Sequence, residues 1–461
     1  MGCQGNSGHV ECPQATRTGS CRATLADADV RVLASDVYSE ARPGWGGDVV
    51  RSMHTDAERL RILWVLPRPL VPLDAGGKIR TWNILRLLAR GHEVTVIGLS
   101  PDGALDLVPR EERGLFRRLV PVAWSEPRKG SVRFWLAVLA NLGSRHAFVL
   151  SKYASSSLRH EIEQLVRAES YDVLVADFLQ VTRSIPKTGL PRVVFQHNVE
   201  SMIRWRHAQS RAWGATRLYL LWEWVRMARW ERRICREYEG VLAVSPEDAE
   251  YFRKEWGARR VWTVSTGVDA ERFSMEGPRV EPADDLVFTG SMDWEANADG
   301  IGWFLDRVWP LILEVRPDTT LGVVGRNPPH WLVRVCQQAG GVTVTGRVPD
   351  VRVHMRGARV FIVPIRFGGG TRIKIYEAMA MGLPVVSTSI GAEGLGLEAG
   401  RHVLLADRPE VFAGSVVELL EDRNRAEFLA GQARKEVVEK RTWQHAAREL
   451  ESALQSVLRG G

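Results

Sequence analysis

The sequence predicts an α/β protein made of two doubly wound, Rossmann-like domains that face a cleft. From residue 61 onward, short apolar segments of strand length alternate with longer segments of helical period. This is the pattern of parallel sheets covered by helices on both faces. A stretch rich in proline and acidic residues, Glu276–Asp285, separates two such series. The length of 461 residues also fits two domains better than one.

The first series opens with a βαβ unit. Arg61–Leu66 is expected to form a buried strand, and a loop with Gly76 and Gly77 follows it. An amphipathic helix at Lys78–Arg90 then leads into a strand at Gly91–Ile97. Three more strands are predicted, at Asp172–Ala176, Arg192–Gln196 and Gly240–Val244.

The second series has five predicted strands: Leu286–Thr289, Thr320–Val324, Val342–Thr345, Val360–Val363 and Pro384–Ser387. A final helix at 442–458 has one apolar face, so we expect it to pack on another part of the chain. The chain therefore divides into a tail at 1–58, an N-terminal domain at 59–272, a C-terminal domain at 273–439 and a terminal helix at 440–461.

The tail at 1–58 is polar and glycine-rich and has no sustained period. Two interpretations stay open: a disordered tail, or a mis-annotated start with Met53 as the true first residue. Asp27 and Asp29 have the spacing of a metal-binding pair, but chance is the simpler explanation in such a segment. No metal site is expected.

The most informative segment, residues 367–386, combines a glycine loop, a helix and a buried strand. The helix is predicted at Thr371–Met381, with a Gly-Leu-Pro stop behind it. Arg372 and Lys374 fall in its first turn, where the helix dipole disfavours a cation by roughly 0.3–1 kcal/mol. This placement indicates an anion held jointly by the two cations, the dipole and the N–H groups of the loop.

Glu377 lies one turn further along the same helix, which is otherwise apolar on nearly every side. A carboxylate in such surroundings needs polar partners, and sugar hydroxyls are suitable ones. The alternative is a purely structural helix in which Arg372 and Lys374 reach solvent and Glu377 pairs with one of them.

The amino-acid composition restricts the class of protein further. No apolar run is long enough to span a membrane, and the five cysteines lack metal-ligand spacing, which indicates a reducing cytoplasm. The net charge of +7 suits an anionic ligand or an anionic membrane surface. Residues 202–237 are rich in arginine and tryptophan, with Trp222, Arg226, Arg229 and Arg233 along one stripe. They are expected to form either a helix with a solvated arginine side or a segment that lies on the inner face of the plasma membrane.

Several ordered motifs resemble one known family. They are Gly76-Gly77, His197-Asn198-Val-Glu200, Val241-Leu-Ala-Val-Ser-Pro-Glu-Asp248, Thr266-Gly-Val-Asp-Ala-Glu-Arg-Phe273, Phe288-Thr-Gly-Ser-Met292 and the Gly368–Glu377 element. From about residue 59 onward, the chain resembles the retaining glycosyltransferases of family 4 (glycosyl transferases group 1), which have the GT-B fold. The resemblance implies a hexosyltransferase type of enzyme. Its C-terminal domain would bind a nucleotide-diphosphate sugar, and its N-terminal domain a glycan or lipid-linked acceptor.

The resemblance also implies residue roles. Glu377 would bind the ribose, Arg372 and Lys374 would neutralise the diphosphate, and His197 would lie over the transferred sugar. Other expected donor-side positions are Gly290, Arg347, Val348, Gly369, Gly370 and Thr371. Gly76, Gly77 and Asn198 would form the loop at the acceptor or the phosphates, because glycine lets a backbone approach closely.

Two positions depart from the family pattern. Gly369 stands where many members have an acidic residue that touches the donor sugar. The stretch Gly290–Asn297 lacks the arginine and lysine that often follow the first strand of the C-terminal domain. We infer that Arg372 and Lys374 replace that pair. They would stabilise the leaving diphosphate electrostatically, without a metal or a cofactor.

Transfer of a sugar with retention, in cell-surface polysaccharide or glycoconjugate synthesis, is the main hypothesis. A nucleotide-sugar 2-epimerase of the same fold and a nucleotide-sugar-binding protein without turnover are the alternatives. A dinucleotide oxidoreductase is disfavoured because the first βα turn has no Gly-x-Gly-x-x-Gly. Nothing in the sequence favours nucleic acid as a partner.

Overall fold

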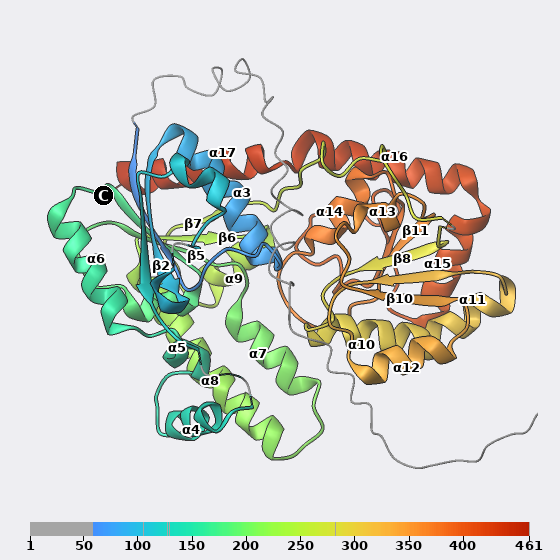
Figure 1. The fold of residues 1–461 in the computed structure, drawn as a ribbon, viewed down its shortest axis with the longest axis horizontal. Coiled ribbons are helices and arrows are strands. Elements are labelled where there is room, and N and C mark those ends of the chain that lie inside the picture. The colour runs from blue at the N-terminus through green and yellow to red at the C-terminus, as the bar shows by residue number, and fades with distance from the viewer. Residues whose placement is uncertain (1–58, 105, 127, 129, 282, 461) are drawn as a thin grey trace, which may run out of the picture.

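The computed structural model describes residues 59–104, 106–126, 128, 130–281 and 283–460. Within them, two parallel sheets lie side by side, each covered by helices on both faces (Figure 1). This confirms the predicted fold class. The predictions for the tail, including Met53, Asp27 and Asp29, fall outside the described residues.

The N-terminal sheet has seven strands in the order β3-β2-β1-β4-β5-β6-β7, with every neighbouring pair parallel. The strands are β1 (Arg61–Leu66), β2 (Glu93–Ser100), β3 (Arg118–Ala123), β4 (Val173–Asp177), β5 (Arg192–Phe195), β6 (Gly240–Ala243) and β7 (Val261–Thr263). The bounds of β1 are as predicted. The two edge strands, β3 and β7, were not predicted, because β3 is only partly buried and β7 is three residues long.

Helices cover both faces of this sheet. They are α3 (Gly76–Gly91), α4 (Val132–Asn141), α5 (Phe148–Lys152), α6 (Ser156–Ala168), α7 (Glu200–Gln209), α8 (Ala215–Glu237) and α9 (Pro246–Lys254), with short 3-10 turns η1 (Pro101–Gly103), η2 (Arg110–Leu115) and η3 (Leu179–Ser184). Alternate residues of β1 serve the two faces: Trp64 packs in the cluster under α3, and Leu63 and Val65 pack in the cluster under α6, α8 and α9. Such continuously buried strands explain the apolar runs in the sequence.

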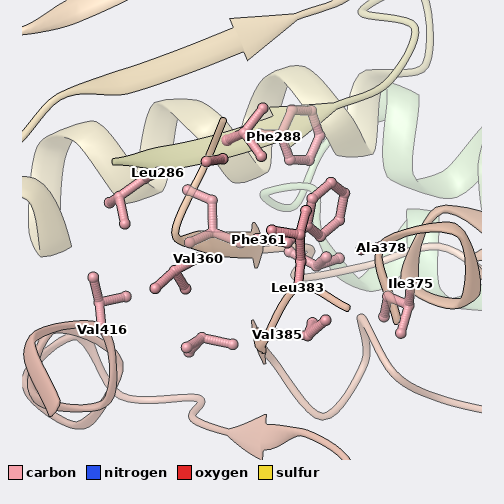
Figure 2. Packing of buried hydrophobic residues seen from close by; sticks show 14 of the residues in the cluster. Leu286, Phe288, Val360, Phe361, Ile375, Ala378, Leu383, Val385 and Val416 are labelled. Carbon is pink, nitrogen blue, oxygen red and sulfur yellow. The ribbon is translucent and has the colours of Figure 1, made fainter. Parts of the chain in front are cut away.

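The C-terminal sheet has six parallel strands in the order β10-β9-β8-β11-β12-β13. They are β8 (Leu286–Thr289), β9 (Leu321–Val324), β10 (Val342–Gly346), β11 (Val360–Val363), β12 (Val385–Ser387) and β13 (Leu404–Leu405). The helices are α10 (Glu295–Trp303), the π-helical η4 (Phe304–Val308), α11 (Trp309–Val315), α12 (His330–Gln338), α13 (Arg352–Met355), α14 (Ile373–Ala380), α15 (Pro409–Glu421) and α16 (Arg423–Lys440). Figure 2 shows how strand residues such as Phe288 and Phe361 pack with Ile375 and Ala378 of α14. This packing fixes α14 to the sheet.

The last helix, α17 (Trp443–Arg459), returns from the C-terminal half to lie beside α3 (Figure 1). Thr442 caps it and forms an isolated bridge with Val268 in the segment between the sheets. Trp443, Leu450 and Leu454 pack in the same apolar cluster as α3. This explains the apolar face of residues 442–458.

None of the helices in the described part of the chain combines the length and apolar character needed to cross a bilayer.

Candidate functional site

The candidate site lies where the carboxyl ends of the two sheets meet. In the N-terminal half, Asp177 ends β4 and His197 follows β5. In the C-terminal half, Gly290 follows β8 and the glycine loop follows β11. Ligands of doubly wound sheets bind at these strand ends.

Four buried residues form a network on the N-terminal side. The ring of His197 donates from Nε2 to Asp177 Oδ1 (2.6 Å), and its Nδ1 accepts from Nη1 of Arg80 (3.2 Å). Because a carboxylate only accepts and a guanidinium only donates, these partners fix the neutral Nε2–H tautomer. Thr81 donates to the other oxygen of Asp177 (2.8 Å). Burial lowers the pKa of His197 despite the carboxylate beside it, so the ring is neutral at pH 7.

The His197 ring is also enclosed by aromatic rings. Phe178, which follows Asp177 with a φ of 69°, stacks on it at 3.9 Å between centroids. Gly77 is needed for this packing, since a Cβ there would lie 2.7 Å from the Phe178 ring. Only 2% of His197 is exposed and both ring nitrogens are engaged, so in this conformation no ring nitrogen is available to a sugar hydroxyl. The geometry favours a positioning role for His197 over direct contact.

Arg80 connects this network to the C-terminal half. Its Nη2 donates to Oγ1 of Thr266 (2.5 Å) and to Oγ1 of Thr371 in the glycine loop. The two threonine hydroxyls are themselves 2.5 Å apart. Burial lowers the pKa of Arg80 to about 10, which leaves it charged at neutral pH. The histidine and the loop are therefore linked through one buried cation.

On the C-terminal side, α14 begins two residues later than predicted, at Ile373. Arg372 is consequently the N-cap residue and does not belong to the first turn, because its backbone (φ −90°, ψ 88°) is not helical. The helix ends as predicted: Gly382 has a φ of 71°, and its neighbour Leu383 donates back to the carbonyl of Ala378 (3.0 Å).

The Arg372 side chain is buried and only partly hydrogen-bonded. Its Nη1 donates to the carbonyl oxygens of Gly369 and Gly370, and its guanidinium lies 4.7 Å from the ring centroid of Trp294. The Nε and Nη2 atoms are buried without a hydrogen-bond partner. Burial lowers its pKa to about 10, so the group is a cation at pH 7 with two donor nitrogens left to bind a ligand.

Lys374 lies in the first turn of α14 and reaches the end of β8. Its Nζ donates to Asn297 Oδ1 (3.0 Å), and a Cβ at Gly290 would lie only 2.6 Å from it. The ammonium thus occupies the region after the first C-terminal strand, where the sequence itself has no cation. Burial lowers the pKa of Lys374 to about 7, and Arg372 adds to this effect.

Glu377 is one turn further along α14. Burial raises its pKa to about 7, although the positive charges of Arg272 and Lys374 oppose the shift. Near neutral pH it can therefore donate as well as accept a hydrogen bond. A pair of groups that both titrate near 7 marks this helix as the chemically unusual part of the cleft.

The glycine loop touches the N-terminal half directly. A Cβ at Gly370 would lie 2.1 Å from Oδ1 of Asn198, and one at Gly369 would lie 2.7 Å from Ile203 of α7. The space that a side chain at position 369 would need is therefore filled by α7. This contact gives a physical reason for glycine where the resembling family has an acid.

Residues at the start and along one side of α7 hold it in this position. Glu231 of α8 accepts from the backbone N–H groups of Glu200 (2.8 Å) and Ser201 (3.2 Å) at the helix start. Further along, Arg206 donates to the carbonyl of Gly368 (2.9 Å) and pairs with both oxygens of Glu393 (2.6 Å each). The glycine loop is thus clamped by a helix of the opposite half.

Comparison with known proteins indicates the class of enzyme. Residues 76–272 match the family model described as Glycosyltransferase Family 4, and residues 283–422 match the one described as Glycosyl transferases group 1. Both halves of the chain therefore match glycosyltransferase families. The two matches follow the two sheets in chain order.

Curated relatives of this glycosyltransferase match over part of their length. A phosphatidyl-myo-inositol mannosyltransferase of Mycobacterium leprae is 30% identical over 236 residues, which cover 48% of this chain and 60% of that protein. A D-inositol 3-phosphate glycosyltransferase of Rhodococcus jostii is 23% identical over 245 residues, covering 47% and 52%. The chain therefore spans little more than half the length of these relatives.

Solved structures agree on the fold of the glycosyltransferase. An Anabaena protein crystallised with UDP and glucose superposes with a TM-score of 0.59 at 15% identity, over 86% of this chain and 100% of that one. At this identity the likeness shows the GT-B fold alone.

The glycosyltransferase brings most predicted site residues together, from Gly76 and Gly77 to the loop at 369–371. Arg347 and Val348 lie further out along the same edge: they follow β10, the outermost strand of the C-terminal sheet on this side, where Arg347 is exposed and Val348 packs on the core. Arg80, Asp177 and Thr266 were missed. Arg80 carried only a weak signal, because it lies in the second turn of α3, where the helix dipole acts less on a cation than at Lys374 in the first turn of α14.

Among the described residues, no group of three or more His, Cys, Asp or Glu side chains could hold a metal ion.

Proposed function

We propose that this protein moves a sugar from a nucleotide-diphosphate sugar to a glycan or lipid-linked acceptor, with retention of the anomeric configuration, in cell-surface polysaccharide or glycoconjugate synthesis. The observation that carries the proposal is Arg372, a buried cation with two donor nitrogens that have no protein partner. It stands beside Lys374 and the N–H groups of a glycine loop at a helix start. This combination suits a diphosphate.

The donor would lie along α14. Arg372 and Lys374 would bind the diphosphate, Glu377 the ribose hydroxyls, and the backbone at Gly346–Val348 the base. Burial of Glu377 supports this assignment, because a carboxyl group with a pKa of about 7 can both donate to and accept from hydroxyls.

The reaction breaks the bond between the anomeric carbon and the diphosphate oxygen and forms a bond to the acceptor oxygen on the same face. Positive charge develops at the anomeric carbon and negative charge on the leaving diphosphate. The two cations stabilise the leaving group, which is the contribution that fixed protein charges make most directly. The proton of the acceptor hydroxyl passes to an oxygen of the leaving phosphate, so no protein base and no metal is assigned.

On the N-terminal side, His197 and Arg80 would act by positioning. Arg80 hydrogen-bonds to His197 and to Thr371, so the network fixes the position of the glycine loop relative to the N-terminal half. The relatives named above are a mannosyltransferase and a D-inositol 3-phosphate glycosyltransferase, and these activities favour a hexose donor.

The test is an NMR time course of the purified protein with UDP-, GDP-, ADP- and TDP-hexoses, in the presence of a chelator. We expect slow release of the nucleotide diphosphate and an α-configured sugar from one donor, with the rate lost in Arg372→Ala. Arg423→Ala, at an exposed position on α16, is the matched control and is expected to behave as the wild type.

Other products identify the alternatives. Free nucleotide with a 2-epimer would show the epimerase. Saturable binding of a donor without any turnover, with or without acceptor glycans, would show a binding protein and overturn the proposal.

A further inference from the structure

Helix α4 exposes its apolar side. Its large apolar residues at i, i+3, i+4 and i+7 face solvent: Val132, Trp135 (57% exposed), Leu136 (59%) and Leu139 (60%). Its one fully buried residue is Asn141, whose amide donates to Ser151 (2.8 Å). A helix in a globular protein normally turns its apolar side inward. Phe134, on the other side of α4, packs on Phe148. A helix with this much exposed apolar surface besides its packed side marks an interaction surface.

The start of α8 continues this surface. Trp213, just before α8, is 75% exposed, and Leu218 and Trp222 are exposed as well. Arg226 ties the two helices together, because its Nη1 donates to the carbonyls of Asn141 (2.9 Å) and Ser144 (2.8 Å) at the end of α4. Figure 1 shows α4 close to α8 on the side of the N-terminal half away from α17, and the contacts that join the two helices lie at Arg226, in the middle of α8. We call Val132, Trp135, Leu136, Leu139, Leu142, Trp213, Leu218 and Trp222 the α4–α8 surface.

The contacts of Arg226 correct one expectation from the sequence. The stripe of Trp222, Arg226, Arg229 and Arg233 is not a single outward face, because Arg226 is buried, pairs with Glu223 and lies against the Trp222 ring. Trp230 also turns inward and donates to Thr182 (2.9 Å). The exposed apolar side chains belong to α4 and to the first turns of α8.

The charged residues around the α4–α8 surface indicate which kind of partner it binds. The sequence has no Asp or Glu between Glu126 and Glu161 or between Glu200 and Glu223. The described arginines of these two stretches include exposed Arg128, Arg133 and Arg145. Arg211 is also exposed but pairs with Glu295 of the C-terminal half. At the boundaries, Glu126 pairs with Lys152 and Glu223 with Arg226. The surface thus combines exposed apolar and tryptophan side chains with bordering arginines rather than acidic residues. This composition suits binding at the interface of an anionic bilayer.

We propose that the α4–α8 surface docks on an anionic lipid membrane, with the apolar side of α4 inserted among the head groups. Helix α7 connects this surface to the site: it starts two residues after Asn198 and ends six residues before Ala215. Ten residues span about 15 Å, so the cleft stays within reach of a membrane-borne acceptor. The use of a lipid-linked acceptor rests on the proposed transfer activity, whereas docking itself does not.

The experiment is flotation of the full chain with phosphatidylcholine vesicles that contain or lack phosphatidylglycerol, without any nucleotide-sugar. We expect binding to the anionic vesicles that high salt weakens, and little binding to phosphatidylcholine alone. The double variant Leu136→Ser/Leu139→Ser is expected to lose binding at least about tenfold, because two exposed apolar side chains no longer insert. Arg133→Glu is expected to weaken binding to anionic vesicles only.

Matched controls are Phe428→Ser and Val315→Ser, which remove equally exposed apolar side chains on α16 and α11. Both are expected to bind as the wild type, and thermal melting of every variant checks the fold. Equal binding by wild type and double variant would overturn the proposal. So would self-association without vesicle binding that the same substitutions abolish, since the surface would then join two copies. Donor hydrolysis in solution, measured separately, shows whether the proposed activity stands whatever the vesicles show.

Discussion

At the scale of single residues, the donor side of the cleft carries charges that folding alone does not favour. Lys374 and Glu377 both have a pKa near 7 because burial disfavours their charged forms. Arg372 keeps its charge but leaves two donor nitrogens unpaired. Buried charged groups without partners reduce stability unless a ligand compensates. The ligand-free site is therefore expected to lower the free energy of unfolding of the protein.

The first prediction concerns Lys374→Met. Because the folded-state pKa lies below the ordinary value of 10.5, the charged lysine destabilises the protein fully below about pH 7. The penalty fades as the pH rises towards 10.5. We therefore expect the variant to melt a few degrees higher than the wild type at pH 6, with a smaller difference at pH 9, and to lose nucleotide affinity.

Lys435→Met, at an exposed position on α16, is the matched control and is expected to leave both properties unchanged. Differential scanning calorimetry measures the melting temperature. A lower melting temperature for Lys374→Met at pH 6 would contradict the described electrostatics.

The second prediction concerns Arg80→Lys. A lysine keeps the charge but cannot donate to His197 and Thr371 at once, because it lacks the planar fork of arginine. We expect kcat to fall by about 10- to 100-fold with little change in KM for the donor, since positioning is lost while diphosphate binding stays. Steady-state kinetics measure both values.

Arg86→Lys, on the same helix and close to Glu112, is the control and is expected to keep wild-type kinetics. If Arg80→Lys also kept its kcat, the link between His197 and the glycine loop would have no role in turnover.

At the scale of elements, the sequence predicted what depends on local pattern. The buried strands β1, β8 and β11 have the expected bounds, because continuous apolar runs between turn signals have few other interpretations. The start of α14 was misplaced by two residues, since Arg372 is held as an N-cap by bonds to the glycine-loop carbonyls. The hydrophobic period of the sequence cannot predict such a contact.

The candidate site was predictable to a similar extent. The cations of α14 could be found from their placement against the helix dipole. The partners of His197 could not, because Asp177 and Arg80 meet it only through the order of strands β1, β4 and β5. Likewise, the contact of Ile203 with Gly369 depends on how the two halves face each other.

The third prediction concerns the anchor of α7. Glu231 accepts hydrogen bonds at the start of α7 and from the indole of Trp256 (3.1 Å). Glu231→Ala leaves these buried donors unpaired, which is expected to destabilise the protein by about 2–4 kcal/mol. Relative to the wild type, amide hydrogen exchange in Glu231→Ala should become faster in α7 and change less in α3.

Glu237→Ala, at the exposed end of α8, is the control and is expected to change stability by less than about 0.5 kcal/mol. Unchanged protection of α7 in Glu231→Ala would show that its packing, and not this carboxylate, holds the helix.

At the scale of the whole molecule, the two halves meet through charged pairs as well as through the glycine loop. Arg326 pairs with Asp74 (2.7 Å), Arg206 with Glu393 (2.6 Å), and Arg211 with Glu295. These pairs join residues far apart in sequence across the site. The described conformation is therefore closed, and its opening is expected to depend on ionic strength.

The fourth prediction follows from the pair at the glycine loop. Glu393→Arg places like charges beside Arg206, so we expect the halves to separate and the radius of gyration in solution scattering to increase. Adding Arg206→Glu restores an opposite pair and is expected to restore the compact value. A double variant as open as the single one would mean that the pair does not control closure.

The most direct test of the donor site is a thermal-shift panel with UDP, GDP, ADP and TDP on the wild type and on Arg372→Ala. A ligand at 100 times its dissociation constant adds about 2.7 kcal/mol of stability to the folded state. We predict that one diphosphate raises the melting temperature of the wild type and that the rise disappears in Arg372→Ala. No rise with any diphosphate, or an equal rise in the variant, would contradict the assignment of Arg372 and the glycine loop as the donor site.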